Sequence, residues 1–237
     1  MKVPRLVELS PRGIRLLELT IVLGVAFLAA GIGSLYVLFT GRLLYPSTGV
    51  TSWRVAVALL YELMALGLLA YVLYRQGRSL SDLGIGLARR DIPWSLALLV
   101  LGVVAAALCY VLVPGWHAIR TGSSPRGINP LAGLTLSIPA VAWILINPFF
   151  EELIVRAYTM TEVLGLTGSG ALAVLVSVGV QTLYHLYQGV PLALAHGATF
   201  LVFSLYYLKT RRIAPVVLAH LYMDAGAFAL WLLRPAA

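Results

Sequence analysis

Charged residues are scarce in this sequence. They make up 11% of the chain, whereas 60% of its residues are hydrophobic and the mean hydropathy is +0.93. Soluble proteins carry about 25% charged residues, so this balance excludes an ordinary soluble globule. The composition instead predicts an integral membrane protein.

Cysteine is nearly absent as well. Cys109 is the single cysteine, which excludes an internal disulfide and a metal site with several cysteine ligands. The zinc-protease pattern His-Glu-x-x-His is also missing, although ligands dispersed over separate helices do not show in local spacing. We therefore expect no cofactor and no metal, with zinc left open on spacing alone.

The net charge of +8 raises the question of nucleic acid binding. The basic residues, however, cluster in short gaps between apolar runs, as the orientation of membrane helices demands. No nucleic acid partner is expected, and the lipid bilayer is the partner that the composition predicts.

Apolar stretches that approach or reach the roughly 20 residues of a membrane-spanning helix recur along the chain. They cover residues 16–39, 53–74, 94–113, 131–150, 171–186, 192–208 and 213–233. No repeat, low-complexity tract or linker separates them, so residues 1–237 are predicted to form one integral membrane domain. The expected fold is all-α and polytopic, with about seven transmembrane helices, or six to eight because boundaries are soft.

The distribution of basic residues predicts the orientation. With the N-terminus inside, the 17 Lys and Arg divide into 12 on the inner side and 5 on the outer side, which favours a cytoplasmic N-terminus in the cell membrane. The first apolar run is too long for a cleaved signal peptide, so residues 1–18 lead into a retained anchor. Residues 75–93 interleave apolar and charged side chains, which indicates a short amphipathic segment at the interface or a plain basic loop.

The fourth apolar stretch contains two prolines. A proline inside a helix removes the hydrogen bond to the carbonyl four residues earlier, so Pro139 and Pro148 are expected to free two carbonyls, those of Thr135 and Ile144. The second break would lie beside a pair of carboxylates and admit water. Residues 129–130, Asn-Pro, are predicted to start this helix.

The least expected charges in the apolar sequence are Glu151, Glu152 and Arg156. An ionised side chain near the bilayer centre costs roughly 2.5–3.5 kcal/mol, so such groups usually face a protein interior or a wet cavity. Glu152 and Arg156 are four residues apart on one helix face and are predicted to pair. Glu151, about 100° round the helix, is left without a partner. The pair lies near the cytoplasmic end of the fourth stretch, or deeper if that helix continues to about Leu164.

More polar side chains interrupt the last third of the sequence. His220 and Asp224 are four residues apart on one helix face, and so are Gln181 and His185. Three helices can therefore bring Glu151, His185 and the His220/Asp224 pair to one interior point, provided that Glu151 lies deep or the fifth helix is tilted.

The same residue types allow three kinds of chemistry. A carboxylate and an imidazole can jointly deprotonate a water that attacks a carbonyl, with donors stabilising the oxyanion. Glu and two His can also hold a metal, and such groups can relay protons in a transporter. For His196 an interhelical hydrogen bond is the simpler interpretation, as are packing or capping roles for Gln181 and Gln188.

These patterns resemble a known family, the intramembrane CAAX prenyl endopeptidases and their bacterial relatives, also called the bacteriocin-processing or abortive-infection group. The resemblance covers residues 147–224 and depends on three motifs in this order inside a multi-span chain. The motifs are Glu151-Glu152-x-x-x-Arg156, Gln181-x-x-x-His185 in place of the family's Phe-x-x-x-His, and His220-x-x-x-Asp224 in place of its His-x-x-x-Asn/Asp.

The resemblance implies an intramembrane endopeptidase with a helical core at about residues 130–233 around a cavity open to the cytoplasm. By the resemblance, Glu151 and His185 activate water, and Arg156 steadies Glu152. His220 and Asp224 would line the oxyanion site. The implied substrate is a peptide or protein, lipidated or not.

Two departures from the family pattern affect these roles. Gln181 makes the pocket more polar than the usual Phe, and Asp224 donates a hydrogen bond to an oxyanion only when protonated. Otherwise Asp224 would orient His220. Since bacterial relatives include immunity and scaffolding proteins, a non-enzymatic membrane protein is the alternative, followed by a proton-coupled transporter.

Overall fold

The structure, a computed structural model, describes residues 10–41, 51–112, 131 and 133–234, and its regular elements within these ranges are all helical. The first half contains α1 (Pro11–Thr40), α2 (Ser52–Arg75), the 3-10 turn η1 (Leu80–Leu83) and α3 (Asp91–Leu112). The second half contains α5 (Ile138–Glu151), the π-helix η2 (Glu152–Tyr158), α6 (Thr159–Thr167), α7 (Gly170–His185), the 3-10 turn η3 (Leu186–Gln188), α8 (Val190–Thr210) and α9 (Ala214–Leu232).

Seven helices within the described residues are long and apolar enough to cross a membrane. The fourth of these spans is the continuous run of α5, η2 and α6 from Ile138 to Thr167. The predicted all-α fold with about seven membrane helices is therefore confirmed, and the protein is an integral, multi-pass membrane protein.

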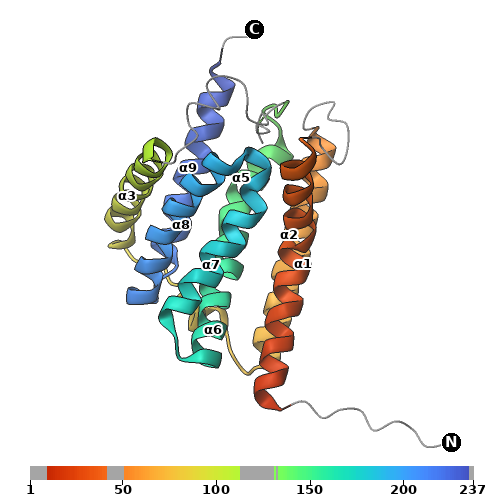
Figure 1. Ribbon diagram of the computed structural model, residues 1–237, viewed down its shortest axis with the longest axis vertical. Coiled ribbons are helices and arrows are strands. Elements are labelled where there is room, and N and C mark those ends of the chain that lie inside the picture. The colour runs from red at the N-terminus through yellow and green to blue at the C-terminus, as the bar shows by residue number, and fades with distance from the viewer. Residues whose placement is uncertain (1–9, 42–50, 113–130, 132, 235–237) are drawn as a thin grey trace, which may run out of the picture.

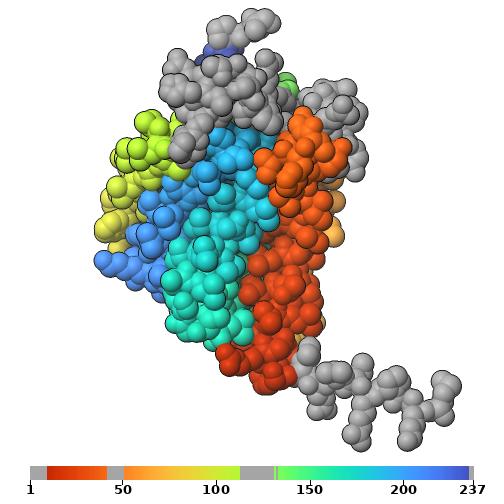
Figure 2. Space-filling view, viewed as in Figure 1, coloured from red at the N-terminus to blue at the C-terminus, as the bar shows by residue number. Residues whose placement is uncertain are grey.

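The spans lie side by side and run in alternating directions (Figure 1). α1 and α2 form one side of the bundle, α3 lies at the opposite side, and α7 and α8 lie between them. In the space-filling view, α1 packs along the segment formed by α6 and α7, and α8 covers the other flank of α7 (Figure 2). The fourth span is half buried by its neighbours, and its central segment η2 is buried completely.

The fourth span begins and ends later than its hydrophobicity predicts. It starts at Ile138 rather than at residue 131, because the Ser137 side chain accepts a hydrogen bond from the N–H of Ala140 and caps the helix there. Pro139 falls in the first turn, where its missing N–H costs nothing, so the expected break at Thr135 is wrong. Residues 129–130 lie outside the described residues. The alternative that the helix continues to about residue 164 is confirmed, since it ends at Thr167.

A π-helical segment lies at the middle of this long span. Pro148 is inside α5 and cannot bond to the carbonyl of Ile144, and the wider π turns follow from Glu152 to Tyr158. The Thr159 N–H and hydroxyl both donate to the Ile154 carbonyl, five residues back, the hydroxyl at 2.7 Å. All seven residues of η2 are buried. Pi segments are rare and often mark functional sites.

Of residues 75–93, which were expected to be an amphipathic segment or a basic loop, Arg75 ends α2 and residues 91–93 begin α3. Residues 76–90 between them form a loop with the short turn η1. The Asp82 carboxylate accepts a hydrogen bond from the Ser79 N–H at 2.6 Å, which lowers the pKa of Asp82 below its usual value. Leu83 is fully buried, and the Gly84 carbonyl accepts a hydrogen bond from the Ile213 N–H at 3.2 Å. The loop is thus fixed to the turn between α8 and α9.

We predict that Gly84→Ala lowers the free energy of unfolding by at least about 1–3 kcal/mol. Gly84 has φ +82, and an added Cβ would lie 1.9 Å from the carbonyl oxygen of Arg211. Thermal unfolding of the purified protein in detergent would measure the loss. Gly86→Ala is the matched control, because a Cβ there meets nothing within 4 Å; equal melting temperatures for the two variants would contradict the prediction.

Candidate active site

The site is organised by an ion pair buried inside the fourth span. Arg156 and Glu152 are both fully buried, and the Arg156 guanidinium donates to the Glu152 carboxylate one turn earlier. Its other nitrogens donate to Gln181 on α7 and, at 3.2 Å, to Ser204 on α8. The rings of Phe200 and Phe203 flank the guanidinium, with centroids 5.2 and 5.7 Å away. The ion pair expected from the four-residue spacing is present and joins three helices.

Glu151 has neighbours that the sequence analysis did not assign to it. Its Oε2 atom accepts hydrogen bonds from the Tyr184 hydroxyl at 2.7 Å and from the Gln181 side-chain amide at 3.1 Å. The expectation that Glu151 lacks a partner is therefore wrong, because the partners come from α7 rather than from its own helix. The opposite end of the Gln181 amide bonds to Arg156, so one glutamine links the ion pair to Glu151.

Tyr184 is itself held from α1. Its ring stacks on Phe27 with centroids 4.8 Å apart, and Phe27 also contacts the ring of Phe150 at 5.2 Å. The Ser34 hydroxyl donates to the Tyr184 carbonyl at 2.6 Å, at the end of α7 where helical partners run out. The first membrane helix thus fixes the residue that binds Glu151.

α9 contributes His220 and Asp224. The His220 Nδ1 lies 2.7 Å from Glu152 Oε1 and, since a carboxylate only accepts, Nδ1 carries the proton. The Nε2 atom lies 4.0 Å from Glu151 Oε2 and 3.7 Å from Asp224 Oδ1. The Asn147 amide donates to the other Asp224 oxygen at 3.5 Å. His220 therefore stands between both glutamates of the pair and the aspartate one turn away.

His185 approaches the centre from the end of α7. Its Nδ1 donates to the Gln181 carbonyl at 2.8 Å, so the neutral ring keeps a free lone pair on Nε2. Its ring centroid lies 5.1 Å from that of His196 and 5.3 Å from that of Phe200, which in turn lies 6.0 Å from that of His220. His196 makes the expected polar contact, with Gln188 at 3.0 Å.

The structure thus links Glu151, Glu152 and Arg156 by direct contacts to Gln181 on α7 and His220 on α9. His185 joins this group through the ring of Phe200, which lies between His185 and His220. The condition that Glu151 lies deep in the membrane is met because the fourth span is long. Glu151 lies near the middle of Ile138–Thr167, where its side chain contacts Tyr184 at the end of α7. Within the described ranges, no group of three or more His, Cys, Asp or Glu is arranged to hold a metal ion.

Two residues that contact or influence the site, Glu62 and Tyr184, were not predicted from the sequence. Glu62 on α2 is buried, accepts a hydrogen bond from the Trp143 indole at 2.7 Å, and interacts electrostatically with Glu151 and Asp224. The only sign of Glu62 in the sequence was its charge within the second apolar stretch, residues 53–74. Tyr184 was the other, and its position three residues after Gln181 on one helix face could have revealed it.

We predict that Arg156→Met lowers the stability by about 3–5 kcal/mol, because it leaves the buried Glu152 carboxylate without its cation. Thermal unfolding in detergent would measure the change. Arg54→Met is the matched control, since Arg54 is exposed. If Arg156→Met melts at the same temperature as the control variant, the pair does not stabilise the bundle.

Comparison with known proteins bears on the second half of the chain. Residues 133–226 match the family model described as type II CAAX prenyl endopeptidase Rce1-like, a segment that contains all three motifs. No curated protein and no solved structure matches the chain. The resemblance expected from the motifs is therefore confirmed, and residues 133–226 are similar to the type II CAAX prenyl endopeptidase family.

Proposed function

We propose that this protein is an intramembrane endopeptidase of the CAAX-protease type, in which Glu151 and His185 activate the water that hydrolyses a peptide bond. The observation that carries the proposal is the convergence of three helices on Glu151, which accepts hydrogen bonds from α7 and lies 4.0 Å from an imidazole nitrogen of α9. Buried carboxylates and imidazoles at membrane depth are costly and are usually kept for function.

Glu151 is held as a base by fixed donors. Tyr184 and Gln181 both bond to Oε2, which leaves Oε1 to accept a proton from water. The hydroxide formed attacks the peptide carbonyl carbon, and the carbonyl π electrons move to its oxygen. When the C–N bond breaks, the leaving amine takes the proton from the Glu151 carboxyl group, so water and peptide yield an acid and an amine.

His185 supports the same step. Because its Nδ1 proton is committed to the Gln181 carbonyl, its Nε2 lone pair is free to accept a hydrogen bond from the attacking water. A base that is fixed by a backbone contact needs no reorientation before proton transfer. The role is therefore one of positioning and polarising the water beside Glu151.

We assign the oxyanion to the side of His220 and Asp224. With Nδ1 bonded to Glu152, a protonated His220 presents its Nε2–H to the substrate oxygen, and Asn147 offers an amide donor nearby. Asp224, 3.7 Å from Nε2, favours the protonated ring and aligns it. Fixed donors of this kind stabilise the charge that develops in the transition state.

The substrate that we propose is a peptide or protein, lipidated or not, that enters from the cytoplasmic side. The basis for this orientation is the excess of Lys and Arg on the side of the chain's N-terminus. Cleavage was expected near the cytoplasmic face, but Glu151 lies near the middle of the fourth span, so we propose cleavage at that depth. The bilayer would supply the surroundings that exclude bulk water from the site.

We predict that Glu151→Gln and His185→Ala each lower peptide cleavage at least about 100-fold, the usual contribution of a general base. Glu151→Gln keeps an oxygen that accepts the Tyr184 hydrogen bond, so it should fold. The measurement compares new peptide termini in membranes of cells that express wild-type or variant protein, followed by cleavage of the identified peptide by purified protein in detergent.

Asp82→Asn serves as the control, because Asp82 is an exposed carboxylate outside the membrane spans. Cleavage at the wild-type rate by both site variants would disprove the proposal. A different result would favour a non-enzymatic scaffold or immunity protein. In that case no new peptide terminus appears when the wild-type protein is expressed, and Glu151→Gln still binds its partner.

We also predict that catalysis needs no metal. Extensive treatment with a chelator should leave the cleavage rate of the purified enzyme unchanged, because the water is activated by Glu151 and His185 alone. A chelated enzyme that is inactive, and regains activity with zinc or another divalent ion, would show that this prediction is wrong.

A further inference from the structure

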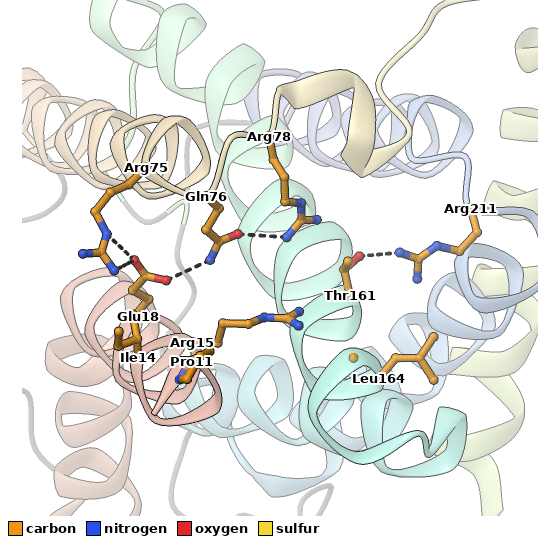
Figure 3. A pocket seen from close by; sticks show the side chains of 11 residues that line it. Pro11, Ile14, Arg15, Glu18, Arg75, Gln76, Arg78, Thr161, Leu164 and Arg211 are labelled. Atoms are coloured by element: carbon orange, nitrogen blue, oxygen red, sulfur yellow. Dashed lines mark hydrogen bonds and ion pairs between the residues drawn. The ribbon is translucent and has the colours of Figure 1, made fainter. Parts of the chain in front are cut away.

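Four arginines line a cavity at the end of the bundle where α1 begins. The cavity measures about 640 Å³ and is lined by residues from α1, α2, α6 and the segments that follow α2 and α8 (Figure 3). The lining arginines are Arg15, Arg75, Arg78 and Arg211. In Figure 3 the side chains of Arg15, Arg78 and Arg211 extend toward Thr161 from three sides.

Carboxylates balance only part of this charge. Glu162, fully buried, accepts from Arg15 at 2.9 Å and from Arg78 at 2.5 Å, so one carboxylate serves two guanidinium groups. Arg75 pairs with Glu18 at 2.6 Å. Four cations and two anions leave an excess of two positive charges around one cavity.

Arg211 is the member without a carboxylate among the described residues. Its Nη2 donates to the Thr161 hydroxyl at 2.5 Å and its guanidinium lies over the Tyr207 ring. Its Nη1 atom is buried and finds no hydrogen-bond partner in the described part of the chain. An unsatisfied charged donor is costly inside a protein, so an acceptor bound in the cavity would stabilise Arg211, which lines it, once the side chain turned to meet that acceptor.

The cavity lies at the depth of lipid headgroups. Pro11 is the first residue of the first span, Arg75 is the last residue of the second, and Arg211 directly follows the last residue of α8. Gly165 lies two residues before the fourth span ends. Basic pockets between membrane helices at this level bind phosphate-bearing lipid headgroups.

We propose that this arginine pocket binds an anionic phosphate group, as carried by a phospholipid headgroup. Guanidinium groups match phosphate oxygens with paired hydrogen bonds. The four arginines that line the cavity supply such donors, and their excess of positive charge favours an anion. The site lies roughly 15 Å along the fourth span from Glu151, ten residues at about 1.5 Å each, and the proposal is independent of the hydrolytic function.

The test uses the full chain, purified in an uncharged detergent. Short-chain phosphatidylglycerol, short-chain phosphatidylcholine and inorganic phosphate are each titrated, and binding is read from the shift in melting temperature and from native mass spectrometry. We expect saturable binding of phosphatidylglycerol at least about fivefold tighter than that of phosphatidylcholine, because of its net charge, and weaker still at high salt.

Two variants locate the site. Arg211→Asn removes the free donor at a position with φ 55, a conformation that asparagine tolerates; we expect roughly five- to tenfold weaker binding. Gly165→Leu keeps every charge but fills the cavity, because a Cβ there already lies 2.7 Å from an Arg15 nitrogen, and should weaken binding as much. Lys209→Gln, an exposed cation two residues before Arg211, controls for general attraction and should bind as the wild type does.

The outcomes separate the sources of the phosphate. Phosphatidylglycerol binding without phosphate binding identifies a lipid headgroup, and equal binding of inorganic phosphate identifies a free phosphate; both support the site. The proposal is overturned if neither anion binds saturably, if phosphatidylcholine binds as tightly as phosphatidylglycerol, or if either folded variant keeps the wild-type dissociation constant.

Discussion

The cost of placing an arginine in the middle of a membrane protein determines how the centre of this bundle is built. Every polar contact of Arg156 must come from protein, because no water or headgroup reaches a residue that is fully buried in the fourth span. Glu152 balances its charge, and the contacts from Gln181 and Ser204 satisfy its remaining nitrogens. These contacts fix the positions of the fourth span, α7 and α8 relative to one another.

Two side chains to which we assign catalytic roles, Glu151 and His220, are connected to that ion pair by single hydrogen bonds. Gln181 binds Arg156 with one end of its amide and Glu151 with the other, which fixes the orientation of both. His220 is bound to Glu152, so its second nitrogen faces Glu151 and Asp224. This explains why a polar residue at position 181 suits the chain although the family pattern has Phe. A phenylalanine would remove the acceptor of one buried Arg156 nitrogen and one of the two hydrogen bonds to Glu151, leaving only that from Tyr184.

The sequence predicted the spans and the Glu152–Arg156 pair, because each depends on a local period or a spacing of four residues. The convergence of the three motifs was expected from the family resemblance, because residues on separate helices leave no local signal. The sequence did not reveal that Tyr184 and Gln181 bind Glu151, since those contacts depend on how α7 packs against α5. The start of the fourth span was misplaced because hydrophobicity does not register a serine cap such as that of Ser137. The buried Glu62 was overlooked because its partner, Trp143, lies 81 residues away.

The fourth span carries charged residues at two depths. The two places differ in how completely protein groups satisfy the arginine donors. At the centre, Arg156 has a protein partner on each of its three nitrogens, because an unmet donor there would face hydrocarbon or packed protein. Near the end of the span, Thr161 and Glu162 contact guanidinium groups that outnumber the carboxylates, and one Arg211 nitrogen has no partner among the described residues. Such an excess is tolerable where lipid phosphates or water can approach, and it would not be tolerable ten residues deeper. Along one helix, the degree to which arginines are satisfied by protein therefore follows the distance from the headgroups, which is the physical reason to expect hydrolysis at one depth and anion binding at the other.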